Sequence, residues 1–318
     1  MPSFKKPMIR SRSHSSASEL SLAASHGNEH FARTLQQRAR QQGVTLLELL
    51  VGIVIGLMTI AVAMGALIAS RGVSSSVSDI SQLQQQASYA FRVIGSQLRQ
   101  AGSLRLNLAP AKNEGDPIDS IDPVAFETAV DGFNPATDSI FGINAPSADE
   151  YKLTVGYRNY TEQLFNKSAS ESMLRNCLGQ TGSDARVRSQ FRFDADTREL
   201  RCAGEDEAKP LVKNVANFSV RYLHQTDPSP FGNPQIKYVN ASALDATQWG
   251  QVTAVEVCIV MFGSDTTNMP AGTTYSDCPA DDGTITKIDM TQLAAPRKNR
   301  VHMVFRNVFQ LRSQGLLG

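Results

Sequence analysis

Residues Val44–Ser70 read VTLLELLVGIVIGLMTIAVAMGALIAS and contain one charged side chain, that of Glu48. A helix of this length crosses the hydrocarbon core of a bilayer, which is about 30 Å thick. Arg33, Arg38 and Arg40 precede the segment, and a cationic flank of this kind stays in the cytoplasm. We therefore predict a single-pass membrane helix over 44–70, with the residues that follow it outside the cytoplasm.

The helical pattern continues beyond the membrane segment. Apolar residues recur at steps of three and four over 71–102, at Val73, Val77, Ile80, Leu83, Ala87, Ala90, Phe91, Ile94 and Leu98, with Gln84, Gln85, Gln86 and Gln97 beside them. This spacing predicts an amphipathic helix that continues the membrane helix and stops at Gly102, a residue type that commonly ends helices. Because the apolar stripe leaves the membrane, a globular domain has to cover it.

The rest of the chain, residues 103–318, has the punctuation and periodicity of a β-rich domain. Frequent Pro, Asp, Asn and Gly predict mainly loops over 103–150. Strand-like segments follow at Tyr151–Tyr157, Val187–Phe193, Glu199–Cys202, Val215–Leu223, Val252–Phe262 and Val301–Leu311. No helix-length segment separates them. We therefore predict an α+β fold in which the long N-terminal helix packs on a mainly antiparallel β-sheet.

The charge distribution separates the first 43 residues from the remainder. The whole chain has a formal net charge of +1, but residues 1–43 are basic and residues 44–318 are mildly acidic. A nucleic-acid-binding domain usually shows a basic face, which this composition does not indicate. The region 1–43 has no sustained apolar period and is interpreted as a cytoplasmic leader.

Four cysteines, Cys177, Cys202, Cys258 and Cys278, lie in the part of the chain predicted to be outside the cytoplasm. They form no C-x-x-C pair and no histidine cluster accompanies them, so we expect neither a metal site nor another cofactor. Two disulfides are expected, most simply Cys177–Cys202 and Cys258–Cys278. Crossed pairing and four reduced thiols stay open, because connectivity is not readable from one sequence.

No arrangement of nucleophile, base and acid is visible in the sequence. His224 and His302 are isolated, and no Ser, Cys or carboxylate stands at a spacing that would complete a catalytic triad with them. We therefore expect the protein not to be an enzyme.

The residues Gln41–Leu49, QQGVTLLEL, resemble the processing site of the type IV prepilin family. In this family a glycine precedes the cut and a glutamate follows in the first turn of the new N-terminus. The resemblance implies that prepilin peptidase cuts between Gly43 and Val44, that the Val44 amine is then methylated, and that Glu48 helps dock the subunit into a filament. Two features depart from the family: its first mature residue is usually Phe, and its leader is usually shorter.

Later blocks of the sequence resemble the PilW type of minor pilin. These blocks are Tyr89–Leu98, Leu211–Tyr222, Trp249–Met261 and Arg300–Arg312. The resemblance implies a minor pilin that is incorporated into a type IV pilus or primes its assembly. Its partners would be prepilin peptidase, other minor and major pilins and the inner-membrane assembly platform. It would reside in the inner membrane with its C-terminal domain in the periplasm, and then in the extracellular pilus.

Three other interpretations are compatible with the same residues. A J-type pseudopilin of the type II secretion apparatus is similar in its N-terminal helix and its size. A pilus-tip subunit could be adhesive or contact DNA during uptake through Lys298, Arg300, Arg306 and Arg312, although a solvated strand face is the simpler explanation of these cations. In a plain signal anchor, Glu48 would snorkel to the membrane surface, and Gly52 and Gly56 would form a generic helix contact.

Overall fold

The computed structural model describes residues 43–107, 125–126, 132–165, 170–182, 185–225 and 235–312. The predicted leader, apart from Gly43, lies outside these residues. The chain forms two units, Met1–Thr59 and Ile60–Gly318.

One long helix, α1, extends from Leu46 to Gln100, as the hydrophobic pattern predicts. Its stretch Leu46–Ile68 is long and apolar enough to cross a membrane. The side chains of this stretch are not covered by the protein, and Leu47 and Val62, for example, are 71% and 74% exposed. A helix that is apolar on every side and uncovered by its own chain is typical of a membrane span.

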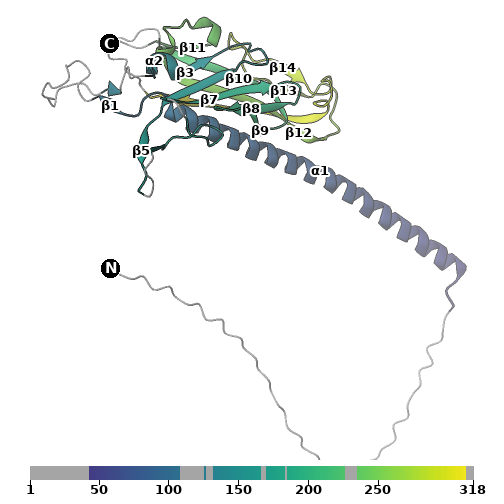
Figure 1. Ribbon diagram of the computed structural model, residues 1–318. Coiled ribbons are helices and arrows are strands. Elements are labelled where there is room, and N and C mark those ends of the chain that lie inside the picture. The colour runs from purple at the N-terminus through teal and green to yellow at the C-terminus, as the bar shows by residue number, and fades with distance from the viewer. Residues whose placement is uncertain are drawn as a thin grey trace, which may run out of the picture. The chain divides into compact units, whose positions relative to one another are not determined.

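The globular part contains two main sheets, whereas the sequence led us to expect one. The five-stranded sheet has the order β3-β4-β7-β8-β9 and consists of Ile140–Gly142, Leu153–Arg158, Arg186–Asp194, Glu199–Ala203 and Lys209–Val212. The four-stranded sheet has the order β11-β10-β12-β15 and consists of Ile236–Val239, Val215–Gln225, Val252–Thr266 and Arg300–Gln310. Every pair of neighbouring strands in both sheets is antiparallel. The predicted α+β class is therefore confirmed (Figure 1).

Short elements complete the described part of the chain. Three antiparallel hairpins are β1-β2 (Leu106–Asn107 and Ala125–Phe126), β5-β6 (Thr161–Gln163 and Ser170–Ser172) and β13-β14 (Thr274–Ser276 and Lys287–Asp289). The short helix α2 is Pro135–Asp138, and two 3-10 turns are Ala241–Ala243 and Trp249–Gln251. All six predicted strands exist, as β4, β7, β8, β10, β12 and β15. The additional strands of the main sheets, β3, β9 and β11, have only three or four residues each, which is too short to show a period.

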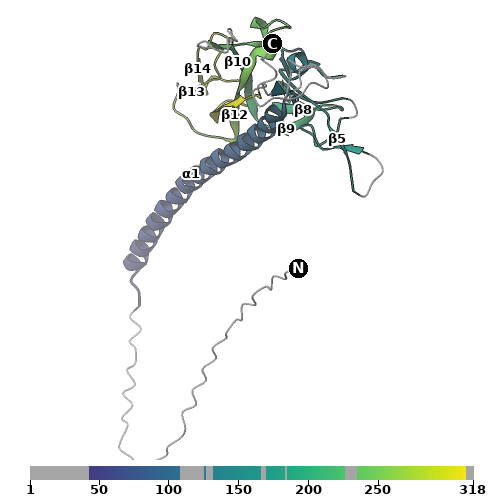
Figure 2. The same cartoon turned by 90° about the vertical axis from the view of Figure 1, so that its left-hand side faces the viewer.

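The main core lies between α1 and both sheets. The helix contributes Leu83, Ala87, Ala90, Ile94 and Leu98, each at most 2% exposed. Figure 1 and Figure 2 show strands of both sheets lying along this part of α1. The sheets contribute buried apolar residues to the same cluster, including Val155, Phe191, Val257 and Ile259.

The buried stripe differs from the predicted one at its first turns. Val77 is 61% exposed, so its predicted place on the covered face is wrong. The residue that faces the sheet at this turn is Asp79, whose carboxylate accepts the N–H of Asp265 at 2.9 Å. Asp79 lies four residues before Leu83 on the same helix face, while Val77 is two residues from Asp79 and points away. A buried carboxylate thus replaces the expected apolar contact.

The other end of the stripe also carries a buried polar side chain. Gln97 was expected beside the stripe, but it is only 5% exposed. Its Oε1 atom accepts hydrogen bonds from Tyr157 Oη at 2.9 Å and from Ser189 Oγ at 2.8 Å. Burial raises the pKa of the Tyr157 phenol, so this donor stays protonated. Gly102 then ends the helix with a positive φ of 87°, and its N–H donates to the Gly156 carbonyl at 2.9 Å.

A glycine of α1 makes the closest approach between the helix and the four-stranded sheet. A Cβ atom on Gly95 would lie 2.4 Å from Cε1 of Phe309 on β15. The Phe309 ring also lies 6.2 Å from the Phe91 ring, centroid to centroid. The ring of Phe309 therefore occupies the space that the missing side chain leaves.

We predict that Gly95→Ala lowers the free energy of unfolding by about 1–3 kcal/mol, because the added methyl group overpacks this contact. Thermal unfolding of the full chain in detergent micelles measures the change. Gly65→Ala is the matched control, since nothing lies within 4 Å of the added atom there. The double variant Gly95→Ala/Phe309→Leu should recover part of the lost free energy of unfolding, because leucine is smaller than phenylalanine and has no ring. An unchanged melting temperature for Gly95→Ala would contradict the packing argument.

Candidate functional site

The first turn of α1 holds the residues that the sequence singles out. Thr45 caps the helix: its Oγ1 accepts the N–H of Glu48 at 3.2 Å, and its carbonyl accepts the N–H of Leu49 at 3.1 Å. A Thr three residues before a Glu is the sequence pattern of a capping box, a signal that the sequence analysis missed. The cap fixes where the helix starts. Gly43 and Val44 consequently precede the helix and have non-helical backbone.

The structure brings Gly43, Val44 and Glu48 together at this end of α1. All three are exposed, Val44 to 68%. Nothing lies within 4 Å of the position that a Cβ atom of Gly43 would take. Among the described residues, no side chain forms an ion pair or a hydrogen bond with the Glu48 carboxylate. The Gly43–Val44 peptide bond is therefore accessible, and a carboxylate lies one helical turn after it.

Two electrostatic effects meet at this site. The N-terminal end of a helix carries roughly half a positive elementary charge. A free amine at Val44 would add a positive charge beside it, which is unfavourable without a compensating anion. Glu48 is the acidic residue in the first turn of α1. The arrangement can therefore hold a positively charged N-terminus close to a helix start.

The four cysteines form two disulfides, and each bond ties a loop to a central strand. Cys177 is bonded to Cys202 on β8, with their Cα atoms 6.4 Å apart. Cys278 is bonded to Cys258 on β12, with their Cα atoms 5.8 Å apart. This is the sequential pairing that the sequence analysis took as the simplest. Both Cα distances lie in the usual range for disulfides.

The second disulfide belongs to a smaller core on the opposite face of the four-stranded sheet from α1. Ala216, Cys258, Val260 and Phe262 of the sheet pack there against Tyr275, Cys278 and Met290 of the segment after β12. The strand β12 is consequently buried on both faces over most of its length.

The two histidines considered in the sequence analysis, His224 and His302, contact neighbouring side chains and backbone of the domain. His302 stacks on Tyr275 with ring centroids 4.5 Å apart, its Nδ1 lies 2.9 Å from the Arg300 carbonyl oxygen, and burial lowers the pKa of its imidazole. His224 Nε2 lies 2.9 Å from Gln251 Oε1. Within the described ranges, no group of three or more His, Cys, Asp or Glu side chains is placed to hold a metal ion.

Two protein families match this chain, one at the start of α1 and one in the globular part. Residues 38–64 match the family described as prokaryotic N-terminal methylation motif. Residues 183–313 match the family described as type IV pilus-assembly protein W, or PilW. Comparison with curated protein sequences gives no match.

Among solved structures, a type IV-like pilin from Thermus thermophilus is similar at 14% identity and a TM-score of 0.32. The similarity covers 72% of this chain and 95% of that one.

We predict that removing the Cys258–Cys278 bond with paired serine substitutions lowers the free energy of unfolding by about 3 kcal/mol, through loss of the loop-closure constraint on the unfolded chain. Unfolding with and without a reductant measures the effect, and reductant should add no further loss at this site in the variant. Non-reducing peptide mapping should recover the 177/202 and 258/278 peptides. Free thiols throughout, or a peptide that joins Cys202 to Cys258, would contradict the pairing.

Proposed function

We propose that this chain is a minor pilin, processed by prepilin peptidase and incorporated into a type IV pilus or used to prime one. The proposal is supported by residues 38–64, which match the N-terminal methylation motif, and by residues 183–313, which match the PilW family. The observation that carries this proposal is the accessible Gly43–Val44 bond just before a capped helix whose first part, Leu46–Ile68, is apolar and has a single carboxylate in its first turn.

The proposed organisation has four parts. Residues 1–43 form a leader that is removed, 44–70 the membrane half of the helix, 71–102 its amphipathic half, and 103–318 the extracytoplasmic domain. The cationic flank before the membrane segment supports a cytoplasmic N-terminus. Two disulfides support an oxidising compartment, such as the periplasm, for the domain.

Processing follows from the backbone at the start of α1. A peptide bond is cut in an extended conformation, and Gly43 and Val44 lie outside the helix that begins at Leu46. Glycine adds no side chain that could obstruct a membrane-embedded peptidase. Cleavage would make Val44 the new N-terminus, and methylation of its amine would follow.

Assembly follows from the charge that processing creates. In a filament, the membrane helices of neighbouring subunits would pack together away from water, where an unpaired ammonium group is strongly disfavoured. Glu48 of the same or a neighbouring subunit would pair with the Val44 amine. A buried pair of this kind selects for correctly placed subunits, because loss of one partner leaves the other unpaired.

A J-type pseudopilin of a type II secretion apparatus would share the same processing. Its filament does not normally extend from the cell surface, so the location of the mature chain separates the two functions. Mass spectrometry of sheared surface filaments tests this directly: a mature chain that begins at Val44 supports the pilus, and its absence from filaments that contain other minor pilins favours the secretion apparatus.

We predict that Gly43→Val abolishes the mature form, because a branched side chain then stands at the residue before the cut. Immunoblotting of membranes shows precursor and mature forms by their difference in size. Gly52→Val is the matched control, since it introduces the same side chain nine residues later where nothing lies within 4 Å. Normal processing of Gly43→Val would exclude this bond as the cleavage site.

We predict that Glu48→Ala leaves membrane insertion and processing intact and removes the subunit from filaments. Insertion survives because the segment becomes more apolar, whereas breaking the buried pair costs about 3–5 kcal/mol in the assembled state. The variant should accumulate as processed protein in the inner membrane. Glu162→Ala, which removes an exposed carboxylate on β5, is the control, and wild-type recovery of Glu48→Ala from sheared filaments would overturn the role of Glu48.

A further inference from the structure

The last strand, β15, is an edge strand of the four-stranded sheet. It pairs with β12 on one side, and among the described residues no strand pairs with its other side. It is eleven residues long, and Val304 and Val308 on it are 37% and 43% exposed. A long edge strand with exposed apolar side chains is a template for pairing with another strand.

The direction of the backbone groups on β15 follows from the register. Leu311 donates its N–H to the Thr253 carbonyl at 2.9 Å, which continues the β12 to β15 ladder. In an antiparallel pair, alternate residues turn their N–H and C=O groups toward and away from the partner strand. Val304, Arg306, Val308 and Gln310 therefore present these groups to the free edge. The Val308 N–H accordingly donates to the Asn307 side chain at 2.9 Å instead of to β12.

The charge on this edge has one sign. Residues 300–312 contain Arg300, Arg306 and Arg312 and no acidic residue. The Arg306 side chain is 49% exposed and lies 3.8 Å from the Glu256 carboxylate, which already binds Arg221 at 2.7 Å. Arg306 therefore keeps most of its capacity to bind an anion. A cationic edge discourages accidental pairing and favours a strand that brings a carboxylate.

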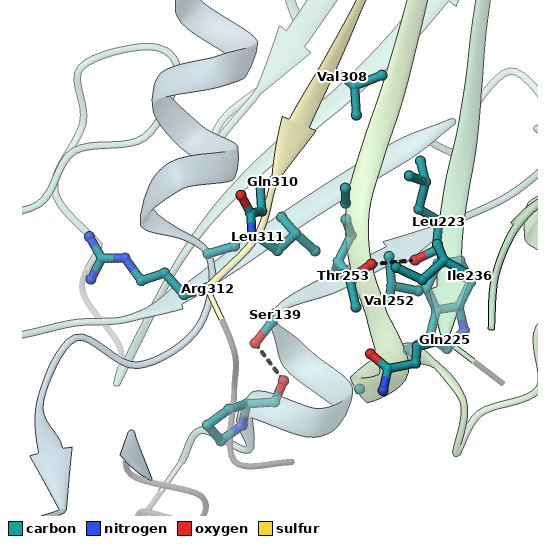
Figure 3. A pocket seen from close by; sticks show the side chains of 16 residues that line it. Ser139, Leu223, Gln225, Ile236, Val252, Thr253, Val308, Gln310, Leu311 and Arg312 are labelled. Carbon is teal, nitrogen blue, oxygen red and sulfur yellow. Dashed lines mark hydrogen bonds between the residues drawn. The ribbon is translucent and has the colours of Figure 1, made fainter. Parts of the chain in front are cut away.

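An apolar cavity of about 460 Å³ lies at the C-terminal end of the same edge. Val308 and Gln310 of β15 and the following Leu311 line it together with Leu223, Ile236 and Trp249 (Figure 3). The cavity has room for one large apolar side chain. Val308 and Gln310 belong both to the free edge and to the lining of the cavity, so the two features adjoin.

We propose that the free edge of β15 binds an extended segment of a neighbouring pilin subunit, by adding it as a further strand to the four-stranded sheet. This inference deepens the proposed minor-pilin function and rests on it for the identity of the partner. On the face that it would share with Val304 and Val308, the segment has apolar side chains, one of which enters the cavity, and a single acidic side chain opposite Arg306. Backbone hydrogen bonds supply affinity, and the cavity and Arg306 supply specificity.

A second copy of this chain fits the edge less well. Antiparallel pairing of β15 with itself about Arg306 places the two guanidinium groups directly opposite each other. Like charges in directly opposed cross-strand positions destabilise the pair. Compared with self-pairing in this register, a different subunit whose strand carries an acidic residue opposite Arg306 fits the edge better.

The test uses the full chain in detergent micelles and two synthetic nine-residue peptides of Val and Thr, which carry at the central position a Glu (the Val/Glu peptide) or a Lys (the Val/Lys peptide). Trp249 is the only tryptophan of the protein and lines the cavity, so its fluorescence reports binding. We expect a saturable change in Trp249 fluorescence with the Val/Glu peptide. The Val/Lys peptide should bind at least about tenfold more weakly than the Val/Glu peptide, because Arg306 repels its lysine. Methylation of the peptide nitrogens that face β15 should abolish binding.

Two variants separate strand pairing from side-chain adsorption. Val308→Pro removes an N–H that β12 does not use, which edge strands tolerate, and should abolish binding of the Val/Glu peptide. Val308→Thr keeps the N–H and should bind. Retained disulfides and an unchanged melting temperature establish that the proline variant is folded. If the proline variant does not fold, binding of the methylated peptide to the unaltered chain tests strand pairing instead.

The proposal is overturned if the Val/Glu peptide gives no saturable change, if its methylated form binds equally well, or if the Val/Lys peptide binds as tightly. The assay involves neither the peptidase nor a filament. A negative result in this assay would therefore not contradict the minor-pilin function. Conversely, normal processing of Gly43→Val would not contradict peptide binding to β15.

Discussion

The covered face of α1 from Leu83 to Leu98 is the contact on which the globular domain depends, because both sheets and the helix share one core there. Each main sheet has an inner face of apolar residues, and neither face is covered by the other sheet alone. The helix supplies five residues that are almost completely buried, each of which removes apolar surface from water at about 25 cal/mol per Å². A chain that lost this part of the helix would expose the inner faces of both sheets.

Two buried polar side chains hold the helix in one register against the sheets. Asp79 accepts the N–H of Asp265 at one end of the stripe, and Gln97 accepts the hydroxyl groups of Tyr157 and Ser189 at the other. Gly263 permits the first contact, since a Cβ atom there would lie 2.6 Å from the Asp79 carboxylate. A purely apolar stripe could slide by a turn at little cost. Sliding this helix would leave a buried carboxylate and a buried amide unpaired, at about 1–3 kcal/mol or more for each.

The long helix, the six principal strands and the start of the helix at the Gly43 region were predictable, because each depends on a period or a spacing within one segment. Features that depend on two segments were not. Burial of Asp79 depends on the backbone of Asp265, and its carboxylate looks from the sequence like an exposed residue of the polar face. The division into two sheets depends on short strands such as β9, which contains Pro210 and has only four residues. Thr45 is different, since its spacing to Glu48 was readable and was overlooked.

At the start of α1, the same residues cap the helix and take part in the proposed processing and assembly. Thr45 accepts the N–H of Glu48 through its side chain, whereas among the described residues the Glu48 carboxylate does not make the reciprocal capping-box bond to the Thr45 N–H and is therefore not consumed by capping. In the proposed mature chain, the amine at Val44 lies just before the positive end of the helix, and the two positive charges repel each other. The carboxylate that offsets them sits on a side chain that the rest of the described protein leaves uncommitted. In an isolated helix in water this ion pair would add little stability, because exposed ion pairs are weak. In a packed bundle of apolar helices it would add much more, because the attraction strengthens as the effective dielectric constant falls. In the proposed filament, Val44, Thr45 and Glu48 would therefore favour the assembled state over the isolated subunit without changing the fold of the domain.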